Sequence, residues 1–153
     1  MTITELAPAK LNLTLDVGTR RPDGYHEITS VMQSAALYDV VTLETVETDD
    51  IVLECPGADL PTGPDNLAWK AADVFFQETN ILRTGIFIRL EKKIPSQAGL
   101  GGGSSDAAAV LRGMRRLFGA NVSDEALETM AARVGSDVPY CVRGGTALAR
   151  GRG

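Results

Sequence analysis

Apolar and polar positions alternate along several short stretches of the chain, and this period of two predicts β-strands. In the clearest stretch the apolar side chains belong to Leu11, Leu13, Leu15 and Val17. We therefore expect a half-buried strand over residues 11–17. Similar patterns predict further strands over residues 27–37, 40–46, 51–55, 86–91 and 146–149. The strands over residues 27–37 and 40–46 are expected to join around Tyr38 and Asp39.

Three other stretches carry apolar residues at helical spacing. The first runs over residues 67–78, with Asp65 or Asn66 as its N-cap. The second covers residues 107–118 before Gly119, and the third lies between Ser123 and Gly135. We expect residues 136–139 to form only a short connection. This order of elements predicts an α+β fold with helices on one face of a largely antiparallel sheet.

A glycine-rich loop precedes the second helix, where residues 99–106 read Gly-Leu-Gly-Gly-Gly-Ser-Ser-Asp. Glycines let the backbone adopt positive φ and let a ligand approach the main chain. Free amides at a helix N-terminus favour an anion, so the stretch predicts a phosphate-binding loop. It lacks the Gly-Lys-Ser/Thr of a Walker loop and the G-x-G-x-x-G spacing of a dinucleotide fold. The alternative is a tight strand-to-helix turn capped by a serine.

The charge and cysteine content exclude several classes of function. A net charge of −5 over 153 residues argues against a general role in binding nucleic acid or a membrane surface. Cys55 and Cys141 form no C-x-x-C motif and are expected to be reduced. The N-terminus lacks a continuous apolar run as long as that of a signal peptide, and no apolar stretch is long enough to span a membrane. We therefore expect a soluble, cytoplasmic protein. An anionic substrate would then be held by the loop amides or by local cations such as Lys10, Arg20, Arg21, Lys92 and Lys93.

A few polar residues outside the loop could carry chemistry. Asp137, before Val138 and Pro139, could deprotonate a substrate hydroxyl, although an Asx-type turn is the commoner role there. Lys10 could neutralise phosphoryl charge, or could be a solvated lysine at a strand end. The only histidine, His26, could hydrogen-bond a heterocycle on which Tyr25 stacks, or the two could be a surface pair beside a turn.

Three stretches together resemble the GHMP kinase superfamily, and within it the family of 4-diphosphocytidyl-2-C-methyl-D-erythritol kinases. They are residues 6–13 with 22–26, residues 94–108, and residues 135–139. The glycine loop alone indicates the superfamily, and Pro-Asp-Gly-Tyr-His after Ala-Pro-Ala-Lys-Leu-Asn narrows the resemblance. It implies an N-terminal domain like the second domain of ribosomal protein S5. It also implies ATP-dependent phosphorylation of a hydroxyl of the cytidyl-linked methylerythritol, in the non-mevalonate route to isoprenoids.

The resemblance also implies roles for individual residues. Asp137 would be the general base and contact the substrate, with Lys10 as its charged partner. Asn12 would contact the polyol, and Tyr25 and His26 would hold the cytosine. Asn66 and Lys93 would lie near the adenine. The ATP phosphates would be wrapped by Pro95, Ala98, Gly99, Leu100, Gly101, Gly102, Gly103, Ser104 and Ser105. The resemblance further implies a bound Mg²⁺ ion, with Ser105 as a ligand.

Two features depart from the family pattern. Ser96 and Gln97 occupy a part of the loop where relatives often carry glycine. The family also has a C-terminal domain, which would begin about where this chain ends. Residues 1–153 are therefore expected to be the ATP- and substrate-binding domain of a truncated form, with weak or no turnover alone. The alternatives are another GHMP small-molecule kinase, acting on homoserine or mevalonate, or a non-catalytic module that self-associates through exposed apolar surface.

Overall fold

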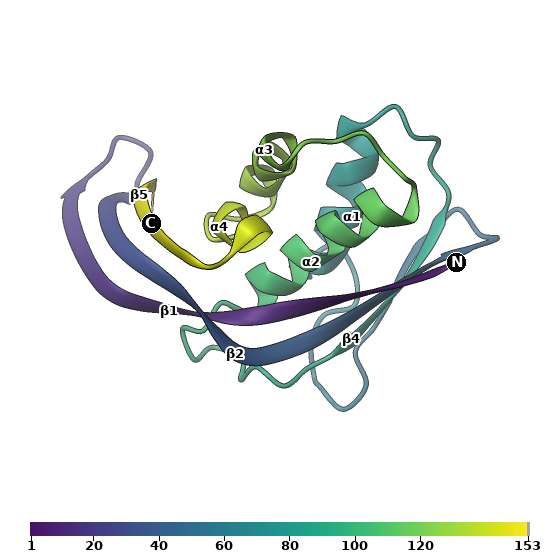
Figure 1. Ribbon diagram of the computed structural model, residues 1–153, viewed down its shortest axis with the longest axis horizontal. Coiled ribbons are helices and arrows are strands. Elements are labelled where there is room, and N and C mark those ends of the chain that lie inside the picture. Colours follow the sequence, from purple (N-terminus) through teal and green to yellow (C-terminus); the bar gives the residue numbers. More distant parts are fainter. Residues whose placement is uncertain (153) are drawn as a thin grey trace.

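The computed structural model describes residues 1–152, in which a mixed sheet carries a layer of helices. The elements in chain order are β1 (Thr2–Arg20), β2 (His26–Val46), β3 (Ile51–Glu54), α1 (Leu67–Glu78), β4 (Gly85–Glu91), α2 (Gly102–Leu117), α3 (Asp124–Val134), α4 (Val138–Arg143) and β5 (Thr146–Arg152). The strand order is β1-β2-β4-β3, and β5 pairs with β2. Only β3 and β4 run parallel among these pairs. The helices lie on one face of the sheet (Figure 1), so the predicted α+β architecture is confirmed.

Strand β2 is continuous where the sequence predicts two strands. Tyr38 and Asp39 lie inside it and pair with Pro8 and Ala7 of β1. The register then shifts, because the next pair joins Ala9 to Ala35 and leaves extra β2 residues without a partner. The break in the apolar pattern therefore marks a bulge, which bends a strand without ending it.

Two helical boundaries also differ from the sequence prediction. Helix α2 begins at Gly102, inside the glycine loop, earlier than the predicted residue 107. Helix α4 replaces the short connection expected over residues 136–139. Pro139 lies in its first turn, where a missing backbone N–H costs nothing because that donor has no helical partner. The proline that suggested a connection is thus compatible with a helix start.

The prediction that residues 11–17 form a half-buried strand is correct about the strand and wrong about its burial. Leu13, Leu15 and Val17 are 58%, 54% and 62% exposed. This part of β1 pairs with the first half of β2, which also pairs with β5. The three strands extend beyond the helices and curl toward the helical side (Figure 1), and these side chains of β1 are left exposed. We call this extension, residues 11–33 with β5, the arm.

The hydrophobic core lies between the sheet and helix α2. Leu43 on β2 and Ile88 on β4 are fully buried beneath Val110, Leu111 and other apolar residues of α2. Helix α1 closes one side of this core, and Asn66 caps it by accepting a hydrogen bond from the Ala68 amide at 2.9 Å. Helix α2 is therefore surrounded by packed apolar surface, which fixes the position of the glycine loop at its N-terminus.

A buried charged cluster adds a second connection between the sheet and α2. Lys92, just after β4, donates from Nζ to Asp39 of β2 at 2.5 Å and to Asp106 of α2 at 2.6 Å. Burial raises the pKa of Asp39, but its hydrogen bonds together, with those from the Ile94 amide and the Lys92 ammonium foremost, make the net shift downward. Burial raises the pKa of Asp106 to about 7 against the opposing effect of Lys92. Removing Lys92 would leave the two buried carboxyl groups without their cation, which is strongly destabilising.

The contrast between the core and the arm can be tested with two leucines. We expect Leu43→Ala to lower the free energy of unfolding by about 2–5 kcal/mol, because it leaves a cavity in the core. Leu13→Ala, on the exposed arm, should change it by less than about 0.5 kcal/mol. Urea unfolding measures both. Equal losses for the two variants would contradict the burial described above.

The charged cluster predicts a pH-dependent stability. Because the pKa of Asp106 is raised to about 7, the folded state keeps a proton that the unfolded state has released above about pH 4. The free energy of unfolding should therefore fall as pH rises toward 7, by at most about 1.4 kcal/mol per pH unit from this group. Asp106→Asn removes this contribution, so its stability should decline less with pH than that of the parent. Asp59→Asn, at an exposed position, is the control and should keep the parental slope.

Candidate active site

The glycine loop lines a cavity of about 450 Å³ beside β1 and the start of α1. Gly101 stands at the N-cap position of α2 with φ of 66°. A Cβ at this position would lie 2.8 Å from Cγ of Lys10, so a residue with a side chain would collide there. The Lys10 amide also donates to the Leu100 carbonyl at 2.9 Å. The loop is thus held directly against β1, with the first amides of α2 at the cavity.

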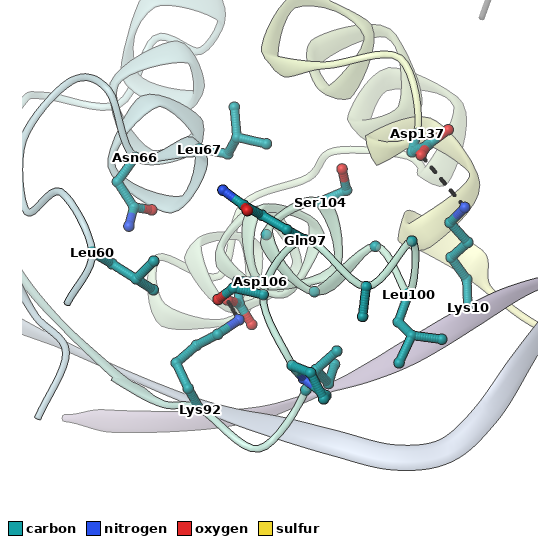
Figure 2. Close-up of a pocket in the computed structure, with 18 of the residues that line it drawn as sticks. Lys10, Leu60, Asn66, Leu67, Lys92, Gln97, Leu100, Ser104, Asp106 and Asp137 are labelled. Atoms are coloured by element: carbon teal, nitrogen blue, oxygen red, sulfur yellow. Dashed lines mark hydrogen bonds and ion pairs between the residues drawn. The ribbon is translucent and has the colours of Figure 1, made fainter. Parts of the chain in front are cut away.

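The two ends of this cavity differ in character. Leu60, Asn66 and Leu67 lie on one side of the loop, and Lys10 and Asp137 lie on the other (Figure 2). The Asn66 side chain is engaged in capping α1 and in donating to the Pro61 carbonyl at 2.9 Å. An elongated ligand could place an apolar ring near the leucines and an anionic group over the loop.

Most of the residues that the resemblance assigns to ATP binding line the glycine-loop cavity, and two do not. Those of the loop that line the cavity are Pro95, Ala98, Gly99, Leu100, Gly101, Gly102, Gly103 and Ser104. Ser105 does not, since it is fully buried and its Oγ has no hydrogen-bond partner among the described residues. Lys93 does not line the cavity either. Its side chain is exposed, and its amide donates to Asp39 at 2.6 Å. Its neighbour Lys92 is the lysine that lines the cavity.

Lys10 and Asp137, which are distant in the sequence, meet at the edge of this cavity. Nζ of Lys10 lies 3.8 Å from Oδ2 of Asp137, and Lys10 is only 7% exposed. Lys10 also donates to Oδ1 of Asn12 at 2.5 Å. Asn12 in turn donates to Ser30 Oγ at 2.8 Å, and Ser30 donates to the Thr14 carbonyl at 2.7 Å. This chain of hydrogen bonds orients the Asn12 amide and, through it, the Lys10 ammonium.

A second hollow lies between the arm and helices α3 and α4, and Asp137 borders it as well. We call it the arm hollow. One part, of about 430 Å³, is lined by Asn12, Met32 and Tyr140 among others. The adjoining part, of about 350 Å³, is lined by His26, Lys10 and the apolar side chains of Leu15 and Val17. Asp137 lines both parts as well as the glycine-loop cavity. A ligand on the loop and another against the arm would therefore meet at Asp137.

The turn between β1 and β2 places Tyr25 and His26 at the end of the arm. Asp23 accepts a hydrogen bond from the Tyr25 amide at 3.0 Å, as expected for an Asx-type turn. His26 lines the arm hollow, whereas Tyr25 is 44% exposed and is not among its lining residues. The structure thus brings His26 to the same hollow as Asn12 and Asp137.

Other reactive groups of the described chain contribute little to this site. Burial raises the pKa of the Cys141 thiol to about 12, so it stays protonated and is a poor nucleophile. Within residues 1–152 no group of three or more His, Cys, Asp or Glu residues could hold a metal ion. The same part of the chain contains no helix long and apolar enough to cross a membrane.

Sequence reasoning did not find the Asp39–Lys92–Asp106 cluster or the supporting role of Ser30. Asp106 belongs to the glycine motif, but its partners come from β2 and from the end of β4. Ser30 meets Asn12 only because β1 and β2 pair in this register. No local sequence signal identifies either arrangement.

Comparison with known proteins shows which family this chain is similar to. The family model of the GHMP kinases N terminal domain matches residues 66–145, just over half of the chain. Over 153 residues the chain is 50% identical to the 4-diphosphocytidyl-2-C-methyl-D-erythritol kinase of Pelotomaculum thermopropionicum, covering 100% of this chain and 53% of that protein. A crystal structure of 4-(cytidine 5'-diphospho)-2C-methyl-D-erythritol kinase is 41% identical, with a TM-score of 0.80 over 97% of this chain and 52% of that one.

A more distant structure shows how widely the fold is shared. The homoserine kinase of Cytophaga hutchinsonii is 22% identical and has a TM-score of 0.76, covering 98% of this chain and 49% of that one. At this identity the likeness concerns the fold alone. The chain spans about half the length of the curated relatives it matches. With the family model, the glycine loop and the fold in agreement, the chain belongs to the GHMP kinase family, whose N-terminal domain it carries.

Proposed function

We propose that this chain supplies the nucleotide- and substrate-binding part of a kinase that transfers the γ-phosphoryl group of ATP to a hydroxyl of 4-diphosphocytidyl-2-C-methyl-D-erythritol. The observation that carries the proposal is the position of Asp137. It lines both the glycine-loop cavity and the arm hollow, with the Lys10 ammonium 3.8 Å away. A phosphoryl donor and a hydroxyl acceptor in these two spaces would have their reacting ends beside one carboxylate. The names of the similar proteins support this choice of substrate.

The glycine-loop cavity suits a nucleoside triphosphate. Unpaired amides at the start of α2 would hold its phosphates, and Leu60 and Leu67 would pack on its base. ATP bound with Mg²⁺ would supply the phosphoryl group, and ADP would be the leaving group. The hydroxyls available to Mg²⁺ are those of Ser104, at the cavity, and Ser105, whose buried oxygen has no hydrogen-bond partner among the described residues. Hydroxyl oxygens beside phosphates are the hard donors that Mg²⁺ prefers.

The pair of Lys10 and Asp137 accounts for the proton transfer. A carboxylate oxygen of Asp137 would accept the proton of the acceptor hydroxyl as that oxygen attacks phosphorus. The nearby ammonium would offset negative charge that develops at the transferred group. Asn12 holds this ammonium in place and also lines the hollow proposed for the acceptor.

The arm would bind the acceptor and determine which acceptor is used. His26 would hydrogen-bond the cytosine edge, Tyr25 would contact the same ring, and Asn12 would contact the polyol. Leu15 and Val17 supply apolar walls in the same hollow. Both substrates are small, soluble phosphates, so we place the reaction in the cytoplasm.

Replacing the central carboxylate tests the chemical step. In the protein that carries this chain, we expect Asp137→Asn to lower kcat by about 10²–10⁴-fold, because the general base is lost. The dissociation constant for ATP should stay close to the parental value, since the loop amides are untouched. Turnover is followed as acceptor-dependent ADP formation. Glu44→Gln changes an exposed carboxylate on β2, outside both spaces, and should keep the parental kcat. Parental turnover in Asp137→Asn would refute the assignment.

Replacing the histidine tests the identity of the acceptor. We expect the parent to bind cytidine diphosphate more tightly than uridine diphosphate, because a hydrogen bond from His26 reads the base. His26→Ala should lose most of this preference, at a cost of about tenfold in affinity for the cytidine ligand. Calorimetry with both ligands measures the ratio, and binding of an ATP analogue is the control. An undiminished cytidine preference in His26→Ala would favour a different GHMP kinase substrate.

A further inference from the structure

Arg112 joins three elements of the fold from a position outside the cavities described above. It lies on α2 and lines a separate hollow of about 520 Å³ with residues of β1 and α4. Its Nη2 donates to the Leu6 carbonyl at 2.8 Å, and its Nη1 donates to the Cys141 carbonyl at 2.9 Å. Its Nε donates to Oε2 of Glu5 at 3.1 Å. One guanidinium therefore connects β1, α2 and α4.

Two of these bonds reach the elements that carry Lys10 and Asp137. Leu6 lies on β1 shortly before Lys10, and Cys141 lies one helical turn after Asp137. The Cys141 amide donates to the Asp137 carbonyl at 3.3 Å, so this turn connects the Arg112 contact to the carboxylate residue. The Arg112 guanidinium thus connects the strand that carries Lys10 to the helix that follows Asp137.

Helix α4 depends on such outside contacts because it is short. It spans only Val138–Arg143, and a helix of this length is unstable without tertiary support. Its last carbonyls lack partners within the helix, and a cation near a helix C-terminus is favourable. Arg112 meets both needs, with a charge and with donors to the Cys141 and Val142 carbonyls.

We infer that Arg112 is a positioning residue, which fixes α4 against β1 and so sets the spacing of Asp137 from Lys10. The inference rests on the proposed phosphoryl transfer for its effect on rate. Small displacements of a reacting group carry large kinetic costs, since about 1 Å of misplacement can reduce a rate about 10²-fold. Arg112 touches no residue of the glycine loop in the contacts described, so nucleotide affinity should not depend on it.

The chain offers a matched control one turn further along α2. Nη1 of Arg116 donates to Oε1 of the same Glu5 at 2.8 Å and to the Thr4 carbonyl at 3.2 Å. These bonds reach β1 but not α4. Replacing Arg116 therefore removes an arginine–glutamate pair between α2 and β1 while the contacts to α4 remain.

The kinetic test compares Arg112→Ala, Arg112→Lys and Arg116→Ala in the protein that carries this chain. We expect Arg112→Ala to lower kcat by about 10- to 100-fold with the KM for ATP within about twofold of the parent. Arg112→Lys keeps the positive charge but loses the planar guanidinium, so its kcat should also fall. This milder change provides a second variant in case Arg112→Ala does not fold. Millimolar guanidinium should restore part of the kcat of Arg112→Ala. Parental kcat in both Arg112 variants, or an equal loss in Arg116→Ala, would overturn the inference.

A second measurement does not depend on turnover. Amide hydrogen exchange at Cys141 and Gly144, whose N–H groups bond within α4, reports how firmly this helix is held. Without ligands, exchange should be faster in Arg112→Ala than in the parent or in Arg116→Ala. If the parent shows no kinase activity, the proposed function fails, and this comparison still decides whether Arg112 holds α4. Unchanged exchange in Arg112→Ala would reject the inference.

Discussion

The close approach of the glycine loop to strand β1 is the contact on which the site depends. The loop can lie against Lys10 because Gly101 has no Cβ, and the Lys10 amide bonds to the Leu100 carbonyl. This contact puts the first amides of α2 and the Lys10 ammonium at one cavity. A side chain at residue 101 would separate them. An anion bound by the loop amides would therefore lie at a defined position relative to Asp137.

Different interactions fix the two sides of this arrangement. The Asp39–Lys92–Asp106 cluster holds the first turns of α2 to the sheet beneath the loop. Arg112, nearer the other end of α2, holds α4 and β1 together. Helix α2 is accordingly the reference from which both the loop and Asp137 are positioned. Its apolar residues are buried in the core, and this close packing makes the helix rigid enough for the role.

The sequence predicts features that local physical chemistry determines. Helix α1 begins and ends as expected, because Asn66 caps it and an apolar stripe follows. The glycine loop is contiguous in the sequence, so the prediction that it binds phosphate needs no structure. The alternation over residues 11–17 predicts a strand, but it does not reveal whether anything packs on that strand, and here these residues are exposed. Pro139 likewise fits both a connection and a helix start.

Contacts between distant residues could not be obtained in the same way. Lys92 and Lys93 both follow β4, and only Lys92 lines the cavity. The direction of each side chain depends on the backbone path after β4, which the sequence does not reveal. The contacts of Arg112 with Leu6 and Cys141 depend on how α2 lies across β1 and α4. The resemblance suggested roles for Lys10 and Asp137, and the fold gives the physical reason they can act together.

The central claim is that donor and acceptor meet at Asp137. A crystal structure of the protein that carries this chain, bound to a non-hydrolysable ATP analogue and the cytidyl-linked methylerythritol, tests it most directly. The account predicts the acceptor hydroxyl within about 3 Å of an Asp137 carboxylate oxygen, with the terminal phosphate over the glycine loop. A hydroxyl directed away from Asp137, or phosphates bound outside the loop, would contradict it.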